Sequence, residues 1–204
     1  MTVTNGYASL ADVKAALRIT DTVDDTLIEI AIESASREID GYCERVFYDF
    51  GTSTRLFLPT DNFLVQIDDL QSISALKTDS NGNGTFDVTW ASDDYQLEPL
   101  NGFVSGLEQP YTRIRAVGSY LFPVFDVFNS NYYEASIQIT GDWGFASVPT
   151  AVRQAGILSS MRQFKRYDAP LGIAGFGDFG PMRVSRIDPD IEQMLSPWRR
   201  LQMA

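Results

Sequence analysis

The sequence predicts an α+β protein: a small helical bundle formed by both chain ends, with an inserted antiparallel β domain and an extended C-terminal arm. Apolar residues follow helical spacing before about residue 48 and again after Pro149. Between these ends, short segments rich in β-branched and aromatic residues alternate with turn residues. Of the 204 residues, 44% are hydrophobic and 21% charged, which suits a globular chain with a core.

The first two helices are predicted over residues 9–18 and 25–46. Ser9 is a suitable N-cap, and Asp12 at the third helical position completes a capping-box pattern. The apolar face of the second helix, which includes Leu27 and Ile30, is wide enough to be buried on more than one side, with the other side covered by another helix of the same chain or by a neighbouring subunit. Subunit packing is therefore expected through Ile28, Ile32, Ala35 and Ile39.

The middle of the chain is predicted to be an antiparallel module of about six or seven strands. Pro, Asn, Gly and Asp residues separate the strands at turn positions. Residues 118–131 form either a hydrophobic loop or an irregular edge strand. The expected strands are 55–58, 63–67, 73–77, 85–90, 95–97, 112–117 and 135–140.

Helix returns near residue 147, where Ser147 is a possible cap and Pro149 suits the first helical position. A short strand is possible over 183–187, and Asp188 and Pro189 then predict the start of a short helix. The predicted parts are a discontinuous helical core over 1–51 and 146–168, a β domain over 52–145, and a docking arm over 169–204. A flexible joint is expected at Gly172, Gly175, Gly177 and Gly180.

Composition excludes several kinds of chemistry. The chain has no histidine and a single cysteine, Cys43, so a structural zinc site, a Cys–His or Ser–His nucleophile and an internal disulfide are excluded. No run approaches the roughly 18 apolar residues of a membrane span, and no secretory signal pattern is recognised. We expect no cofactor, no metal and no enzymatic activity.

Charge is segregated along the chain, whose net charge is −11. Residues 1–149 carry eight Lys/Arg against 22 Asp/Glu, whereas residues 150–204 carry eight against five. The basic end is either a docking surface for an acidic partner or an ordinary solvated helix face. Apolar, aromatic and guanidinium side chains near the terminus are typical of interface hot spots. The expected docking residues are Ile191, Leu195, Trp198, Arg199 and Arg200.

Three motifs resemble chemical sites. Residues 79–87 match the start of a calcium loop, but Trp90 stands where the bidentate glutamate belongs, and a polar hairpin turn is favoured. The acidic pairs at 68–69 and 93–94 could serve a hydrolase, but they lack catalytic partners and are interpreted as turn residues. The glycine pattern over 172–180 lacks the strand and helix of a dinucleotide site.

Two segments resemble phage head–tail connector (head-completion adaptor) proteins. The first combines a short helix with a longer one that carries the pattern at Asp25, Leu27, Ile28, Ile32, Ala35, Ser36, Ile39, Asp40 and Tyr42. The second is the opening of the last core helix, with Trp143, Gly144, Val148, Pro149, Val152 and Ala155. The resemblance covers about residues 7–48 and 138–167.

The resemblance implies a structural, portal-binding virion protein that forms a ring, usually of about twelve copies, beneath the portal. Its expected partners are the portal protein, neighbouring copies and the next neck or tail-completion protein. DNA would pass through the channel without sequence-specific contact, and the acidic wall would let it slide. The expected location is the head–tail junction, after virus assembly in the host cytoplasm. The alternative is a non-enzymatic β-domain binding module for glycan or protein on a virion or cell surface.

Overall fold

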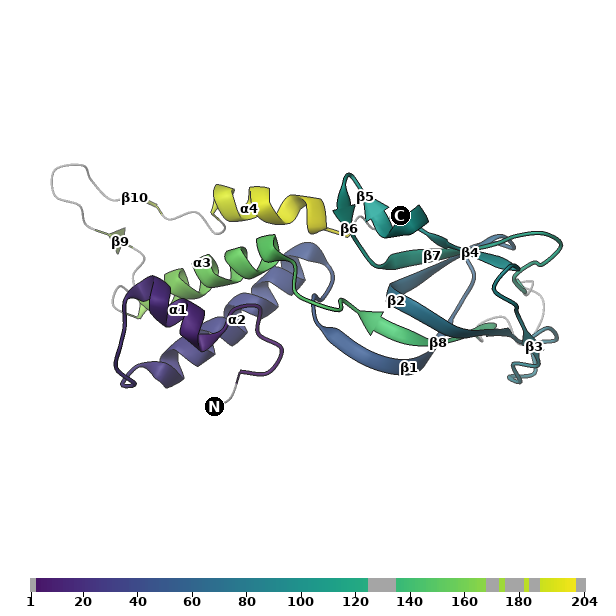
Figure 1. Ribbon diagram of the computed structural model, residues 1–204, viewed down its shortest axis with the longest axis horizontal. Helices are drawn as coiled ribbons and strands as arrows, with labels where there is room; N and C mark the ends of the chain where they lie inside the picture. The colour runs from purple at the N-terminus through teal and green to yellow at the C-terminus, as the bar shows by residue number, and fades with distance from the viewer. Residues whose placement is uncertain (1–2, 125–134, 168–172, 175–181, 184–187, 201–204) are drawn as a thin grey trace. The chain divides into compact units, whose positions relative to one another are not determined.

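The computed structural model describes residues 3–124, 135–167, 173–174, 182–183 and 188–200 (Figure 1). The chain divides into two compact units. Residues Met1–Phe47 and Val148–Ala204 form the helical unit, and Tyr48–Ser147 form the β unit. The predicted α+β class is confirmed.

The helical unit contains α1 (Leu10–Leu17), α2 (Asp25–Cys43), α3 (Thr150–Arg166) and α4 (Pro189–Leu195), followed by the short η3 (Ser196–Trp198). Two short strands, β9 (Ile173–Ala174) and β10 (Met182–Arg183), pair with each other. The predicted capping box of α1 is confirmed. The Ser9 hydroxyl accepts the N–H of Asp12 at 3.1 Å, and the Asp12 carboxylate accepts the N–H of Ser9 at 3.3 Å.

The core of the helical unit lies where α1, α2 and α3 meet. It includes Ala8, Val13, Ile28, Ala31, Ile32 and Phe164. The close approach of the segment before α1 to α3 depends on Gly156, because a Cβ there would lie 3.2 Å from the Cβ of Tyr7. The segment that precedes α1 is therefore packed directly against the α3 backbone.

Two predicted details of the helix ends were wrong. Helix α2 ends at Cys43 rather than Val46, because Glu44 adopts a left-handed backbone with φ of 54°. Pro149 is the N-cap of α3 rather than its first helical residue, and no side chain caps that end. The start of α4 is as predicted, with the Asp188 side chain accepting the N–H of Asp190 and Pro189 in the first turn.

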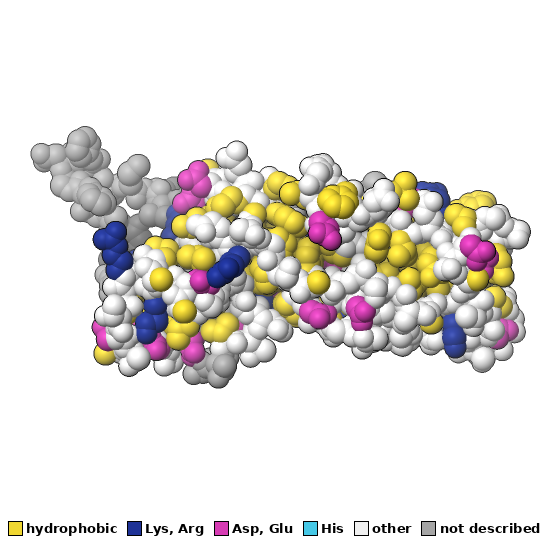
Figure 2. All heavy atoms as spheres, viewed as in Figure 1, with side chains coloured by type: hydrophobic (Ala, Val, Ile, Leu, Met, Phe, Trp, Pro, Cys, Tyr) yellow, Lys and Arg dark blue, Asp and Glu magenta, His cyan; other side chains and the backbone are white. Residues whose placement is uncertain are grey.

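The β unit is built on an antiparallel sheet with strand order β1-β8-β2-β7-β4, and β3 pairs with β2 beside this path. A separate hairpin is formed by β5 and β6. Figure 2 shows apolar and acidic side chains on the surface of this unit. The strands are β1 (Asp49–Phe57), β2 (Leu64–Thr78), β3 (Val88–Thr89), β4 (Tyr95–Glu98), β5 (Phe103–Val104), β6 (Leu107–Glu108), β7 (Tyr111–Ala116) and β8 (Ile137–Gly144).

Strand β2 corrects the prediction of separate strands over 63–67 and 73–77. It runs through both predicted segments without a turn between them. Where the sequence predicts that turn, the strand has irregularities in register between Gln66 and Leu70 and between Leu70 and Ser72, which are typical of β-bulges. The first part of β2 pairs with β7 and the later part with β8. The predicted strand over 85–90 is likewise shorter and reduces to β3.

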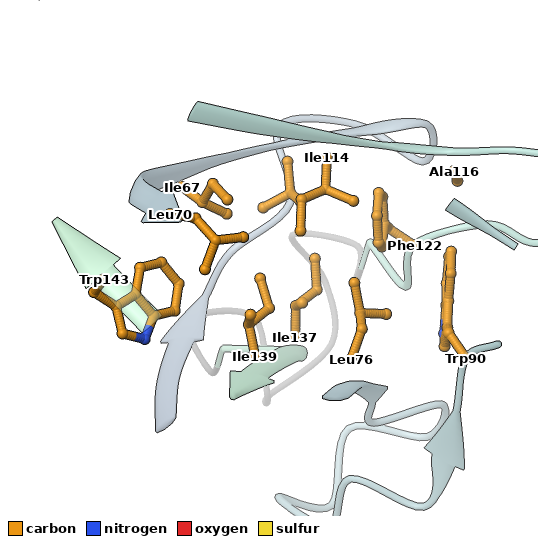
Figure 3. Packing of buried hydrophobic residues seen from close by; sticks show 11 residues of the cluster. Ile67, Leu70, Leu76, Trp90, Ile114, Ala116, Phe122, Ile137, Ile139 and Trp143 are labelled. Carbon is orange, nitrogen blue, oxygen red and sulfur yellow. The ribbon is translucent and has the colours of Figure 1, made fainter. Parts of the chain in front are cut away.

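The core of the β unit fills one face of this sheet (Figure 3). The Trp90 indole stacks on Phe122 with ring centroids 4.7 Å apart, and its N–H donates to the Thr78 hydroxyl at 3.0 Å. Phe122 belongs to the segment that was predicted as a loop or an edge strand. Its described part, 118–124, is a loop, and the remainder lies outside the described residues. The buried cluster comprises Val65, Ile67, Leu70, Leu76, Trp90, Ile114, Ala116, Phe122, Ile137, Ile139 and Trp143.

Within the described ranges, no helix combines the length and the apolar character needed to cross a membrane.

Candidate interaction surfaces

The three apolar residues predicted to dock on a partner are buried within the helical unit. Ile191, Leu195 and Trp198 are 4%, 2% and 7% exposed, respectively. Helix α4 packs on α3, and the Trp198 ring meets Phe47 edge-on at 6.2 Å. Burial of such side chains on their own unit holds this segment in place.

Polar contacts add to the attachment of α4 and η3. Asp188 forms an ion pair with Arg162 at 2.9 Å, and the backbone N–H of Arg200 donates a hydrogen bond to the Cys43 carbonyl at 2.8 Å. Arg199 lies over the Tyr42 ring and 3.6 Å from the Glu44 carboxylate. Of the five predicted docking residues, only Arg199 and Arg200 retain exposed surface. The joint glycines, Gly172, Gly175, Gly177 and Gly180, lie outside the described residues.

The four side chains that were predicted to pack subunits together are already buried by other residues of this chain. Ile28, Ile32, Ala35 and Ile39 are buried, with Ile28 and Ile32 in the core beneath α1 and α3. Leu27 and Ile30, which the sequence pattern placed on the same broad apolar face, are exposed within this chain. The reason is that α1 and α3 cover only one side of α2, so its apolar stripe is wider than its cover.

The calcium-like segment is a hairpin loop between β2 and β3, as favoured from the sequence. The Asp79 carboxylate accepts four backbone N–H groups of the loop, at distances from 2.7 to 3.3 Å. Burial would raise the pKa of Asp79, but these N–H groups outweigh it and lower the pKa. Gly82 and Gly84 supply the positive φ that the loop requires. The carboxylate expected as the first calcium ligand is thus engaged by the backbone.

The two acidic pairs have structural partners. Asp68 forms an ion pair with Arg55 at 2.7 Å. It lies within strand β2, where the register is irregular, so the prediction of a turn there was wrong. Asp94 does lie in a turn, where its carboxylate accepts the N–H of Ala91 at 2.7 Å. Among the described residues, no three Cys, Asp or Glu side chains gather to hold a metal ion.

The surface of the β unit is acidic and carries exposed apolar side chains. Residues 48–147 contain 13 Asp/Glu and four Lys/Arg. The exposed apolar residues include Leu56 and Leu58 at the end of β1, and Phe103 and Val104 of the β5–β6 hairpin. Such surface is typical of proteins that contact other macromolecules.

Residues 7–78 match the model of the family described as Phage gp6-like head-tail connector protein. The match spans α1, α2, β1 and β2, and so includes the helical opening from which the resemblance was inferred. The resemblance to head–tail connector proteins is thereby confirmed. A comparison with curated proteins finds no match.

Solved structures share the fold over the full chain. The neck of an empty GTA particle computed with C6 symmetry contains a chain with 15% identity and a TM-score of 0.57, covering 100% of this chain and 95% of that one. The neck of a native GTA particle computed with C12 symmetry contains a chain with 14% identity and a TM-score of 0.55, and the match covers 100% of this chain and 94% of that one. The virion of a native gene transfer agent (GTA) particle contains a chain with 16% identity and a TM-score of 0.54, and the match covers 100% of this chain and 95% of that one.

Proposed function

We propose that this chain is a structural head–tail connector subunit of a tailed bacteriophage or a related particle. The family match over residues 7–78 carries the proposal. The similarity of the whole fold to chains in GTA necks supports it. In this function the protein acts by binding its neighbours in the particle and needs no catalytic group.

The subunit is proposed to assemble as a ring at the head–tail junction, between the portal and the next neck or tail-completion protein. The C6 and C12 symmetry of the similar neck structures supports a ring of about twelve copies. The assembly would take place in the host cytoplasm before the particle is completed.

DNA is proposed to pass through the ring without sequence-specific contact. The acidic composition of the β unit supports this role, because clustered carboxylates repel phosphates. A wall that neutralised phosphates would bind DNA and oppose its movement. The exposed acidic side chains of the β unit therefore suit a surface that DNA slides past.

The C-terminal segment is proposed to contact the portal through Arg199 and Arg200. Ile191, Leu195 and Trp198 are used within the helical unit, so they position the two arginines rather than bind the partner directly. Guanidinium groups suit this role because they pair with carboxylates in two parallel hydrogen bonds.

The alternative of a glycan- or protein-binding β module has less support. It would be favoured by exposed Trp90, Tyr95, Tyr111 and Tyr120 in a shallow groove, but Trp90 is 5% exposed and belongs to the core of the β unit. The family match and the shared fold also favour the connector.

The portal of the same particle provides the test. The mass of the purified protein, alone and mixed with the portal, should show a complex with a ring of copies. Arg199→Ala/Arg200→Ala should weaken portal binding. Arg153→Ala, which removes a basic side chain from the first turn of α3, should not. A mixture in which the wild-type protein stays a single copy and leaves the portal unbound would reject the connector function. Substitution is preferred to truncation, since removal of α4 would uncover the core beneath it.

A further inference from the structure

Helix α2 has a second apolar face that points away from the core of the helical unit. Val23, just before the helix, is 85% exposed, and Leu27 and Ile30 are 38% and 41% exposed. The spacing of Leu27 and Ile30 places these two on one side of the helix, and Val23 lies just before the N-cap Asp24. Water therefore meets large aliphatic side chains at the start of α2, which is unfavourable unless a partner covers them.

The same side of α2 continues with small and charged residues. Ser34 and Gly41 follow Ile30 by four and eleven residues, and the exposed Arg37 and Glu38 lie between them. A Cβ on Gly41 would meet nothing within 4 Å, so no contact inside the chain requires glycine there. Glycine inside a helix costs about 1 kcal/mol relative to alanine. The apolar start of the stripe is therefore followed by a polar part that can pair with charged groups of a partner.

Charge identifies the kind of partner that fits. Residues 19–41, which include the whole stripe, contain seven Asp/Glu and one Lys/Arg. Helix α3 has the opposite character, with four Lys/Arg and no Asp/Glu. Its last turn presents Lys165 and Arg166, which take part in no ion pair among the described residues, and beside them the exposed Tyr167. An aromatic ring next to two cations complements an aliphatic stripe in an acidic setting.

We propose that the stripe formed by Val23, Leu27, Ile30, Ser34 and Gly41 binds a second copy of this chain, which inserts the Tyr167 end of its α3. This inference rests on the proposed function and names the contact that closes its ring. The two surfaces differ, so each copy offers the stripe to one neighbour and its α3 end to the other. Head-to-tail contacts of this kind generate rings. Nucleic acid is disfavoured as the occupant because it would meet the acidic residues around the stripe.

The test compares Leu27→Asp with Ala11→Asp. Each substitution adds one negative charge in the first turn of a helix, so the expected effect on the helix dipole is similar. Ala11 is exposed and lies on α1, so it is not part of the stripe. Mass measurement over a range of protein concentrations, alone and with the portal, reports the number of copies. Leu27→Asp should raise the concentration for half-assembly by at least about tenfold. Ala11→Asp should assemble like the wild type, and circular dichroism should show both variants folded.

A second arm tests the complementary surface. Lys165→Glu/Arg166→Glu should weaken assembly, and the double variant Thr150→Glu/Gln154→Glu, with the same number of added carboxylates on exposed positions elsewhere on α3, should weaken it less. Unchanged assembly of Leu27→Asp beside a normal wild-type ring would overturn this inference and leave the connector function standing. A wild-type protein that never forms a multimer, with or without the portal, would remove both. Binding of a DNA oligonucleotide that is lost in Leu27→Asp would reassign the stripe to nucleic acid.

Discussion

The Tyr7 hydroxyl donates a hydrogen bond to the Asp40 carboxylate and accepts one from the backbone N–H of Phe47, at 2.8 Å. The Tyr7 backbone N–H also donates to the Ser36 hydroxyl at 3.0 Å. One side chain thereby ties the segment before α1 to the end of α2 and to the residue where the helical unit gives way to the β unit. Burial and the Asp40 hydrogen bond both raise the pKa of Tyr7, so it remains protonated and can act as the donor.

Replacement of this tyrosine tests the connection. Tyr7→Phe keeps the ring but leaves the buried Phe47 N–H without its acceptor. We expect the free energy of unfolding to fall by about 1–3 kcal/mol, measured by urea denaturation. Tyr167→Phe is the matched control, since its exposed hydroxyl should contribute less than about 0.5 kcal/mol. Equal stability of the two variants would contradict the role assigned to Tyr7.

Asp40 should give the protein a characteristic pH dependence. Burial raises the pKa of its carboxyl, although the Tyr7 hydrogen bond and Arg37 act to lower it. The folded state therefore binds the proton more tightly than the unfolded state, where the pKa is about 3.9. Its stabilising contribution is complete below that value and declines as pH rises through the folded pKa.

Asp40→Asn should remove this component. The stability of the wild type relative to Asp40→Asn should decrease as pH rises from the acid range toward neutrality, as measured by urea denaturation at a series of pH values. A difference that grows with pH would mean that the pair with Arg37, at 3.1 Å, outweighs burial.

Two helical glycines should respond in opposite ways to alanine. Gly156→Ala places a Cβ against Tyr7 and should lower stability by about 1–3 kcal/mol despite the better helix propensity. Gly41→Ala meets open space and should raise the stability of the isolated subunit by up to about 1 kcal/mol. The Tm of both variants, measured by thermal unfolding, tests this prediction. A higher Tm of Gly156→Ala would show that the contact between α3 and Tyr7 is loose.

The β2–β3 loop should be stabilised by Asp79 rather than by calcium. Asp79→Ala frees four N–H groups and should lower the stability of the β unit by about 1–3 kcal/mol, whereas Asp87→Ala should have a smaller effect. Because the loop N–H groups lower the pKa of Asp79, its contribution is present above the unfolded pKa and is lost as pH falls through the folded value. Calcium at about 5 mM should leave the Tm unchanged. A calcium-dependent rise that Asp79→Ala abolishes would identify a cation site.

Local sequence signals determined much of this protein. The Ser9–Asp12 box, the Asp188–Pro189 start and the loop at 79–87 depend on neighbours within a few residues, and each was predicted correctly. The helical opening that resembles head–tail connectors is local in the same sense, since its pattern lies within two consecutive helices.

Tertiary structure decided which apolar residues face the core and which face solvent. Leu27 and Ile28 are adjacent and equally apolar, yet only Ile28 is buried, because α1 and α3 cover one side of α2. The sequence predicts Trp198 as a docking residue, but in the folded chain its ring packs against Phe47, 151 positions earlier. Strand β2 is continuous because β7 and β8 pair with its two parts in turn. A helical or alternating pattern specifies where apolar side chains lie along an element, but only the packed fold specifies which neighbour, if any, covers them.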